Sequence, residues 1–566
     1  MSNKIEAKEH PLAKIFSSDF AFHIPHYQRP YAWSESQCSE LFDDLYDAFE
    51  TNNARETNNE NYFLGSVVLV KKENEAHCDV IDGQQRLTSI TILLACMYDE
   101  THLNHVKEYI NEPGKPLENI RPNPRLTLRE LDREFFKKHI QNFEIQALLD
   151  KDPKHLGNDA QRNIQANCAY FKKKLEEKFK NASGERDFKK LEQFAGFLIN
   201  SCFIVAISTP DQDSAIRIFT VMNNRGINLQ TSDLIKAEII GKIDKDKQAE
   251  YSQLWEEMEE KFSREDFDEF FSHVRMIYVR KKAKDTVFKE IKDNVLDKNN
   301  LEGFVKNDLQ NYANALSSIN NKNFSSSKNE GDINELFGWL NRIDNSDWKP
   351  VAIEFFSKNR NKKNSSDEIL HFFKKLERLA VYLVLCSSHV NKRIERYGKI
   401  LKQLKEKNSY KDIELSDEEK KEMKTALGDD IYKMKSNKAK YILLRLDRFF
   451  SEKCADYKDR AITIEHVLPQ TVSEGSEWGK NWPDEDVRNE WVHKIANLVL
   501  LGRKKNSEAQ NSDFDNKKKT YYNTSGNAPS FPLTAQVIVK DKWTKEVLEE
   551  RQKELLDKMF KEWELN

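Results

Sequence analysis

The chain has 566 residues, of which 38% are hydrophobic and 33% charged, and its 91 basic and 94 acidic side chains leave a net charge of −3. This length exceeds what one hydrophobic core holds, so two or three domains are expected, and the composition excludes a disordered chain. The balanced charge gives no global preference for nucleic acid, and no apolar run reaches the roughly 20 residues that cross a bilayer.

The seven cysteines are scattered, with no Cys-x-x-Cys pair. This spacing argues against a cysteine-based zinc site and favours reduced thiols. The N-terminal stretch MSNKIEAKEH lacks the apolar core of a signal peptide. We therefore expect a cytoplasmic protein that has no membrane partner.

The first 245 residues alternate predicted strands and helices. β-Branched apolar runs bounded by polar turns predict strands, and apolar residues at helical spacing predict helices. The predicted elements are helices at about 36–50, 85–100, within 125–200 and within 213–243, and strands at 62–72, 77–82 and 201–208. Such alternation is typical of an α/β domain.

The remainder of the chain divides at about residue 455. Residues 246–455 have helical apolar spacing interrupted by polar loops, whereas 456–566 contain a short strand pair and a loop, a Lys-rich segment and a final amphipathic helix. The sequence therefore predicts an α+β, mostly helical multidomain chain. Its predicted domains are residues 1–245, 246–455 and 456–566.

The stretch DVIDGQQRLTSI places a polar turn between a predicted strand and a predicted helix. Asp82 and Gly83 form the turn, and Gln84, Gln85 and Arg86 open the helix. A helix N-terminus attracts phosphate, Arg86 adds a bidentate donor, and Asp82 is suited to orienting water or a metal. A plain strand–turn–helix corner with a structural Asp–Arg pair accounts for these residues equally well.

The stretch FHIPHYQRPYAWSESQ gathers polar and aromatic residues around two prolines. Tyr27, Gln28 and Arg29 are candidates for ligand binding, and Arg29 is the strongest of the three. Tyr31 and Trp33 are more typical of residues that pack in a core.

The stretch IFTVMNNRGINLQTSDLIK breaks a helical pattern with an Asn-Asn-Arg-Gly turn that contains Asn224 and Arg225. Asp233 and Lys236 follow on the next predicted helix. Their spacing of three residues is that of an intrahelical ion pair, which is the simplest reading of these two side chains.

The stretch AITIEHVLPQ ends a short apolar run with an acid and an imidazole. Phosphodiester cleavage needs a base and a hard cation, and such a cation prefers oxygen ligands. His466 is suited to the role of base, and Glu465 and the downstream Asn506 can offer oxygen atoms to the metal. Asn497 can hold the preceding loop through side-chain bonds to backbone.

Basic residues follow this pattern closely in the sequence. Arg503, Lys504, Lys505 and Lys517–Lys519 are placed where they could hold phosphates. Taken alone, the lysines fit an ordinary solvated face as well.

The pattern EHVLPQ…ANLVLL…KKN resembles an HNH (ββα-metal) nuclease, in the variant whose last His is Asn. The resemblance implies Glu465 and Asn506 as ligands of Mg²⁺ or Mn²⁺, His466 as general base and Asn497 as loop stabiliser. Relatives often have Gly where this chain has Ala496, which bears on local backbone geometry.

The three N-terminal stretches together resemble the N-terminal domain of GmrSD-type, modification-dependent (type IV) restriction enzymes, which are related to SspE and similar in fold to ParB and sulfiredoxin. The resemblance implies that the DGQQR turn binds and hydrolyses a nucleoside triphosphate, and that the YQR stretch helps to read modified DNA. The implied nucleotide-binding residues are Asp82, Gly83, Gln84, Gln85, Arg86, Asn224 and Arg225, with Asp82 and Arg86 also catalytic. The implied DNA-binding residues are Tyr27, Gln28 and Arg29.

We therefore expect a nucleotide-regulated, metal-dependent DNA endonuclease of an antiphage defence system that senses modified phage DNA. One HNH site cuts one strand, so a homodimer would be needed for a double-strand break. Two alternatives stay open at this point. One is a nucleotide-switched DNA-binding regulator with a degenerate nuclease domain, and the other is an HNH toxin that acts on RNA or host DNA.

Overall fold

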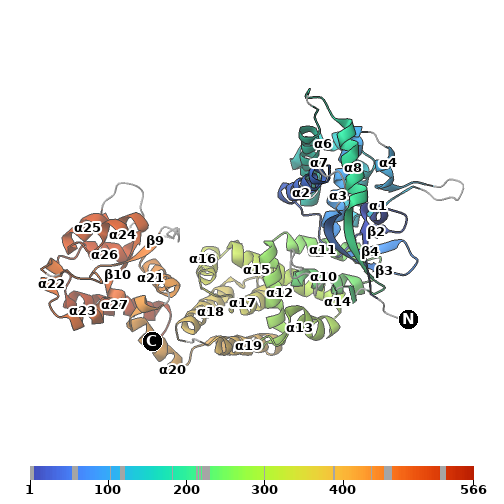
Figure 1. Cartoon of the computed structure of the whole chain (residues 1–566). Helices are drawn as coiled ribbons and strands as arrows, with labels where there is room; N and C mark the ends of the chain where they lie inside the picture. Colours follow the sequence, from blue (N-terminus) through green and yellow to red (C-terminus); the bar gives the residue numbers. More distant parts are fainter. Residues whose placement is uncertain are drawn as a thin grey trace. The chain divides into compact units, whose positions relative to one another are not determined.

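The computed structural model describes residues 5–53, 61–101, 104–114, 122–181, 183–211, 214–215, 218, 230–298, 300–386, 389–434, 436–451, 462–473, 475–522 and 531–566. The chain forms two compact units, Met1–Glu257 and Met258–Asn566. Figure 1 shows that helices dominate and that the largest sheet lies in the N-terminal unit. The fold is α+β and mostly helical, as the sequence predicts, whereas the three-domain division stays a prediction.

The N-terminal unit is built on a six-stranded mixed sheet with the order β1-β8-β3-β4-β2-β7. Its strands are β1 (Glu6–Pro11), β2 (Ala21–His23), β3 (Tyr62–Lys71), β4 (His77–Asp82), β7 (Leu126–Thr127) and β8 (Cys202–Thr209). A two-stranded sheet pairs β5 (Asn111–Glu112) with β6 (Asn123–Pro124). The predicted strands at 62–72, 77–82 and 201–208 are confirmed.

Three strands of this sheet were missed by sequence reasoning. β1 has an exposed, polar sequence, and it joins the sheet only because it pairs along its length with buried β8. β2 and β7 have three and two residues, too few to show an alternating pattern. The region 125–200, which we predicted as helical, therefore begins with a strand and becomes helical from Glu130.

Helices cover the sheet and form the main core of this unit. The α-helices described within the first 259 residues are α1 (Leu12–Ile15), α2 (Glu35–Asn53), α3 (Gln84–Thr101), α4 (Asn104–Glu108), α5 (Glu130–Phe136), α6 (Ile145–Leu149), α7 (Asp159–Lys178), α8 (Phe188–Ser201), α10 (Thr231–Lys242) and α11 (Gln248–Glu259). α3 lies between α7 and α8, and α2 packs on the same pair. Thirteen residues of α3 are buried, which confirms the predicted central helix.

The opposite face of the sheet carries a smaller apolar cluster. Val68, Ile81, Ile207 and Ala215 are buried there, and Tyr27 packs against them. Because side chains alternate along a strand, Ile81 faces this cluster while Val80 faces the main core. Both faces of β4 are therefore partly buried, and its C-terminal end is the point where the chain turns into α3.

The second unit begins with a helical region. Its helices are α12 (Arg264–Val279), α13 (Val287–Asn294), α14 (Leu301–Gly303), α15 (Gln310–Asn321), α16 (Glu330–Asn341), α17 (Lys349–Asn359), α18 (Ser366–Cys386), α19 (Val390–Glu406), α20 (Asp417–Gly428) and α21 (Ser436–Phe450). Among the described residues from 258 to 451 no strand is present, as the sequence predicts.

The C-terminal part surrounds a two-stranded antiparallel sheet. Its elements are β9 (Ile462–His466), α22 (Glu477–Asn481), α23 (Glu485–Trp491), β10 (Leu498–Gly502), α24 (Arg503–Ala509), α25 (Phe514–Tyr522), α26 (Pro532–Ile538) and α27 (Lys545–Glu562). The predicted strand pair and final helix are confirmed. α21 packs directly on β10, α26 and α27, so this part shares its core with the preceding helices.

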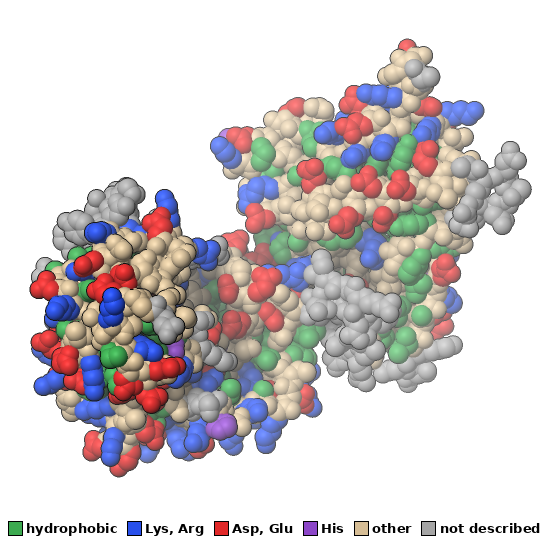
Figure 2. Space-filling view, turned by 60° about the vertical axis from the view of Figure 1, so that its left-hand side comes forward, with side chains coloured by type: hydrophobic (Ala, Val, Ile, Leu, Met, Phe, Trp, Pro, Cys, Tyr) green, Lys and Arg blue, Asp and Glu red, His purple; other side chains and the backbone are tan. Residues whose placement is uncertain are grey.

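The surface carries charges of both signs. On the face that Figure 2 shows, basic and acidic side chains are intermixed, in keeping with the balanced composition. Across the described part of the chain, every cysteine is a free thiol. None of the described helices combines the length and apolar character that a membrane crossing needs.

Candidate active site

The C-terminal candidate residues lie on two strands and the helix that follows them. β9 and β10 pair so that Glu465 lies opposite Val499 and His466 opposite Leu498. The strands form because β-branched and apolar residues fill both, and α24 begins directly after Gly502. The sequence order strand, strand, helix thus becomes one compact unit that carries Glu465, His466 and Asn506.

Asn497 holds the chain just beyond β9. Its side chain is completely buried and donates to the carbonyl oxygens of Leu468 (2.8 Å) and Val492 (2.9 Å). Its Oδ1 accepts from the Leu468 N–H (2.7 Å) and from the indole N–H of Trp543 (3.0 Å). These four bonds fix the loop after His466 to the turn before β10.

Glu465 is buried beside the ammonium group of Lys517, a residue that the sequence did not connect with it. Its Oε1 accepts from Lys517 Nζ at 2.7 Å and from the Tyr521 hydroxyl at 3.0 Å. Burial raises the pKa of the Glu465 carboxyl, against the opposing effect of Lys517, and burial lowers the pKa of Lys517. An ordinary solvated face is therefore the wrong reading for Lys517, because its side chain is 1% exposed.

His466 lies on the opposite side of β9 in an aromatic setting. Its ring makes an edge contact with Tyr432 at 4.2 Å between centroids, and His493 stacks on Tyr432 and lies 5.5 Å from His466. Gln470 Nε2 lies 3.3 Å from His466 Nδ1, whereas His466 Nε2 is buried and has no hydrogen-bond partner among the described residues. Burial, with smaller effects of His493 and Lys517, lowers the pKa of His466 to about 3, so the imidazole is neutral.

Tyr432 and His493 were not singled out from the sequence. Tyr432 belongs to the 3₁₀ turn Ile431–Lys433, inside the region predicted as a separate helical domain. The Tyr432 N–H donates to the His493 carbonyl oxygen, which fixes the two rings together. No local pattern signals this contact, because the two residues are brought together only by the fold.

Asn506 lies on α24 against the strand that carries the acid and the imidazole. Its Nδ2 donates to Thr463 Oγ1 (2.9 Å) and to the Ile464 carbonyl oxygen (3.0 Å). These bonds engage the amide nitrogen and leave the amide oxygen as the atom suited to a cation. A carboxylate and an amide oxygen are ligands that Mg²⁺ and Mn²⁺ accept, and both cations fill their remaining positions with water or phosphate oxygen.

The basic residues after β10 divide into exposed and engaged side chains. Arg503 and Lys504 are exposed at the start of α24. Lys505 Nζ donates to the Tyr521 carbonyl oxygen at 3.0 Å, and Lys518 Nζ donates to the Lys540 carbonyl oxygen at 3.2 Å. Lys519 is exposed on α25.

The N-terminal turn has the geometry that its sequence predicts. β4 ends at Asp82, Gly83 has φ +98°, and α3 begins at Gln84. A Cβ on Gly83 would lie 2.5 Å from Val67 Cγ1, so both the backbone conformation and the packing require glycine. Because the first N–H groups of a helix have no intrahelical partner, the start of α3 can accept an anion.

The two glutamines of the turn have a structural task. Gln84 Nε2 donates to Gln28 Oε1 and to the Arg29 carbonyl oxygen, both at 3.2 Å. Gln85 Oε1 accepts from the Ala32 N–H at 2.7 Å, and Gln85 Nε2 donates to the Pro30 carbonyl oxygen at 3.1 Å. Both side chains therefore hold the 28–33 stretch against the start of α3.

Asp82 and Arg86 are the turn residues whose charged groups lie near each other. Burial raises the pKa of Asp82, while the Gly83 N–H, Arg86 and Arg29 oppose that shift. Arg86 Nη1 donates to the Ser66 carbonyl oxygen at 3.0 Å. The guanidinium thus rests on β3 next to a partly buried carboxyl.

The YQR stretch is more buried than expected of residues that contact DNA at the surface. Tyr27 packs in the apolar cluster on the second face of the sheet, and Gln28 donates to the Ile81 carbonyl oxygen at 2.9 Å. Tyr31 is 5% exposed and bonds to Ser89 at 2.7 Å, in agreement with a packing role. Arg29 contributes charge near Asp82.

The remaining N-terminal candidates divide between the described and undescribed residues. Asn224 and Arg225 lie outside the described residues. Asp233 accepts from the Gln230 N–H and closes a capping box at the start of α10, and Lys236 Nζ lies 3.5 Å from Glu256. The intrahelical Asp233–Lys236 pair stays a prediction.

Two family models match the chain. The N-terminal domain of GmrSD restriction endonucleases matches residues 12–240, and the C-terminal domain of GmrSD restriction endonucleases matches residues 417–558. The first match contains the Asp82–Arg86 turn. The second begins at α20 and contains Tyr432 and the whole β9–β10–α24 site. No curated protein matches the chain.

Proposed function

The chain belongs to the GmrSD family of restriction endonucleases, and from that premise we propose that it is a metal-dependent DNA endonuclease that cuts at the β9–β10–α24 site under the control of a nucleoside triphosphate. The observation that carries the proposal is the buried Nε2 of His466, which has no hydrogen-bond partner among the described residues, on the same strand as Glu465 and in the same β9–β10–α24 unit as Asn506. Two antiparallel strands followed by a helix are also the order of an HNH (ββα-metal) nuclease.

His466 acts as the general base in this proposal. For Nε2 to take a proton from the water that attacks phosphorus, the ring must carry its own proton at Nδ1, with the Gln470 amide turned so that its oxygen accepts from Nδ1–H. The edge contact with Tyr432 holds the ring in place. Asn497 fixes the loop that follows His466, and therefore the direction of the ring.

Glu465 and Asn506 would hold Mg²⁺ or Mn²⁺. The bound cation supplies charge stabilisation to the phosphate and to the leaving oxygen. The site favours a positive charge, because burial destabilises the Glu465 carboxylate and Lys517 compensates it only in part. Arg503 and Lys504, exposed at the start of α24, would contact phosphates on either side of the scissile bond.

The N-terminal unit would bind the nucleotide and sense the DNA modification. The start of α3 offers N–H groups to a phosphate, and Asp82 has the raised pKa typical of functional carboxyls. Gln84 and Gln85 connect this turn to the 28–33 stretch. A triphosphate at the turn would therefore change how Arg29 is presented to modified phage DNA, in a domain similar to ParB and sulfiredoxin.

A cleavage panel tests the proposal. Full-length protein, its His466→Ala variant and a control His371→Ala variant are incubated with Mn²⁺ on plain, glucosylated-hydroxymethylcytosine and phosphorothioate plasmids and on RNA, with and without each triphosphate. His371 is exposed on α18, so its replacement leaves the site intact. We expect cleavage of one modified DNA class by the wild type and the control, and a loss of about 100-fold or more in His466→Ala.

The outcomes separate the alternatives. Cleavage of RNA or plain DNA instead of modified DNA would favour a toxin. Absence of cleavage together with nucleotide-dependent DNA binding would favour a regulator, and equal cleavage by His466→Ala would overturn the assignment of the base. Conversion of supercoiled plasmid to nicked or linear form reports whether two copies act together.

A further inference from the structure

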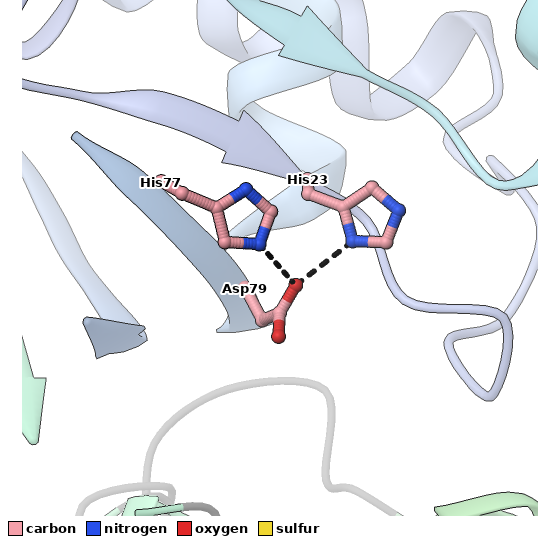
Figure 3. A group of neighbouring side chains, drawn as sticks. All are labelled: His23, His77 and Asp79. Atoms are coloured by element: carbon pink, nitrogen blue, oxygen red, sulfur yellow. Dashed lines mark hydrogen bonds and ion pairs between the residues drawn. The ribbon is translucent and has the colours of Figure 1, made fainter. Parts of the chain in front are cut away.

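Two histidines and an aspartate gather on one side of the N-terminal sheet, apart from the Asp82 turn. β2 and β4 run parallel, with Ala21 opposite His77 and His23 opposite Asp79. Side chains two apart on a strand point to the same side, so His77 and Asp79 lie together and His23 lies beside them. Figure 3 shows both imidazoles directed at the Asp79 carboxylate.

The distances between these groups are those of a small metal site. His23 Nδ1 lies 2.8 Å and His77 Nε2 3.4 Å from Asp79 Oδ1, and all three ligand atoms lie within 4.8 Å of one another. Ligand atoms around a tetrahedral ion with bonds of about 2 Å are about 3.3 Å apart. Small side-chain rotations therefore suffice to seat an ion.

We propose that His23, His77 and Asp79 bind one Zn²⁺ or a similar transition-metal ion, in a site distinct from the Mg²⁺ or Mn²⁺ site at Glu465 and Asn506. Imidazole nitrogen suits zinc, whereas Mg²⁺ selects oxygen ligands. Within the described residues this is the one group of three His, Cys, Asp or Glu ligands that meets these distances.

The site is open on one side. His77 has 64% of its side chain exposed and Asp79 38%, so a fourth position faces solvent and can take water or a ligand. Asp82 lies three residues after Asp79 on the same strand and therefore points to the other face of the sheet. The ion is thus separate from a nucleotide bound at the start of α3.

The ion would fasten β2 to β4. β2 has only three residues, and the chain runs from His23 into Pro25 and Tyr27, the beginning of the YQR stretch. Metal at His23 would fix the start of that stretch, as Gln84 and Gln85 fix its end. The inference rests on the N-terminal unit alone and does not depend on the nuclease assignment.

The test measures retained metal on the tag-free full chain. A Glu465→Gln/Asn506→Ala background removes the other proposed site, and to it are added His77→Ala, Asp79→Asn or the control His371→Ala. Each protein is loaded with Zn²⁺ or Co²⁺ and dialysed, and metal is counted by mass spectrometry. Visible absorption of the Co²⁺ form reports the coordination geometry.

We expect one ion per chain in the background protein and in the control, with a visible Co²⁺ spectrum. Retained metal should be largely lost in both variants, because His77→Ala removes one of three ligands and Asp79→Asn replaces the carboxylate by a neutral amide oxygen. His77 is exposed and Asp79→Asn preserves shape, and equal unfolding temperatures in chelator confirm that both variants fold. Absence of retained metal in the background protein, or equal retention in all variants, overturns the proposal.

Discussion

Lys517→Met removes the positive partner of the buried Lys517–Glu465 ion pair at the proposed catalytic site. Methionine keeps the volume of the lysine stem and removes the ammonium group that lies 2.7 Å from Glu465 and 2.6 Å from the His466 carbonyl oxygen. Glu465, which is 6% exposed, then keeps only the hydrogen bond from the Tyr521 hydroxyl of these two side-chain partners. The variant therefore exposes how the protein compensates this carboxylate.

The expected cost follows from burial. Removing one partner of a buried ion pair costs about 3–5 kcal/mol, because the other charge is left uncompensated. A divalent cation on Glu465 and Asn506 supplies the missing positive charge, and a ligand at 100 times its dissociation constant contributes about 2.7 kcal/mol. Replacing both partners, in Lys517→Met/Glu465→Gln, leaves no buried charge and should cost much less.

Hydrogen exchange of peptides from β9 and β10 measures this locally. In chelator, Lys517→Met should exchange about 100-fold faster than the wild type or more, since 1.4 kcal/mol is tenfold. Mn²⁺ should restore most of the protection in Lys517→Met and change the double variant little. Unchanged exchange in Lys517→Met, or equal Mn²⁺ protection of both variants, would refute the link between Lys517, Glu465 and the cation.

Three further predictions concern stability. Asn497→Asp keeps the two accepted hydrogen bonds but removes both donors to backbone carbonyl oxygens, and should cost about 3 kcal/mol by exchange of the β10 amides. Gly83→Ala forces a positive φ on alanine and a 2.5 Å contact with Val67, so the free energy of unfolding should fall by about 2 kcal/mol or more, as measured by thermal unfolding. Burial lowers the pKa of His273 below its ordinary value of 6.5, so the unfolded state takes up its proton first and stability falls as the pH drops below 6.5. His273→Phe should flatten that slope in acid unfolding curves.

Local patterns were enough for the elements on which both sites are built. β-Branched runs bounded by polar turns predicted β3, β4, β8, β9 and β10, and the Asp82-Gly83 pair predicted the turn into α3. These signals are local, because strand periodicity and a glycine at positive φ are set by neighbouring residues. The pairing of acid and imidazole with a downstream asparagine was likewise visible in the sequence.

The environment of those residues was decided by tertiary structure. Lys517 lies 52 residues from Glu465 in a run of three lysines that looks solvated, yet the fold buries it against the carboxylate. Gln84 and Gln85 read as nucleotide ligands, yet they hold the 28–33 stretch.

The sequence by itself determined the longer strands, the helices and the candidate residues Glu465, His466 and Asn506, because periodicity and turn residues act over a few positions. Only the tertiary structure decided that β1, β2 and β7 complete the sheet, that Tyr432 covers His466, and that His23 meets His77 and Asp79. Burial and partner choice depend on contacts between distant segments, and no local pattern encodes those contacts.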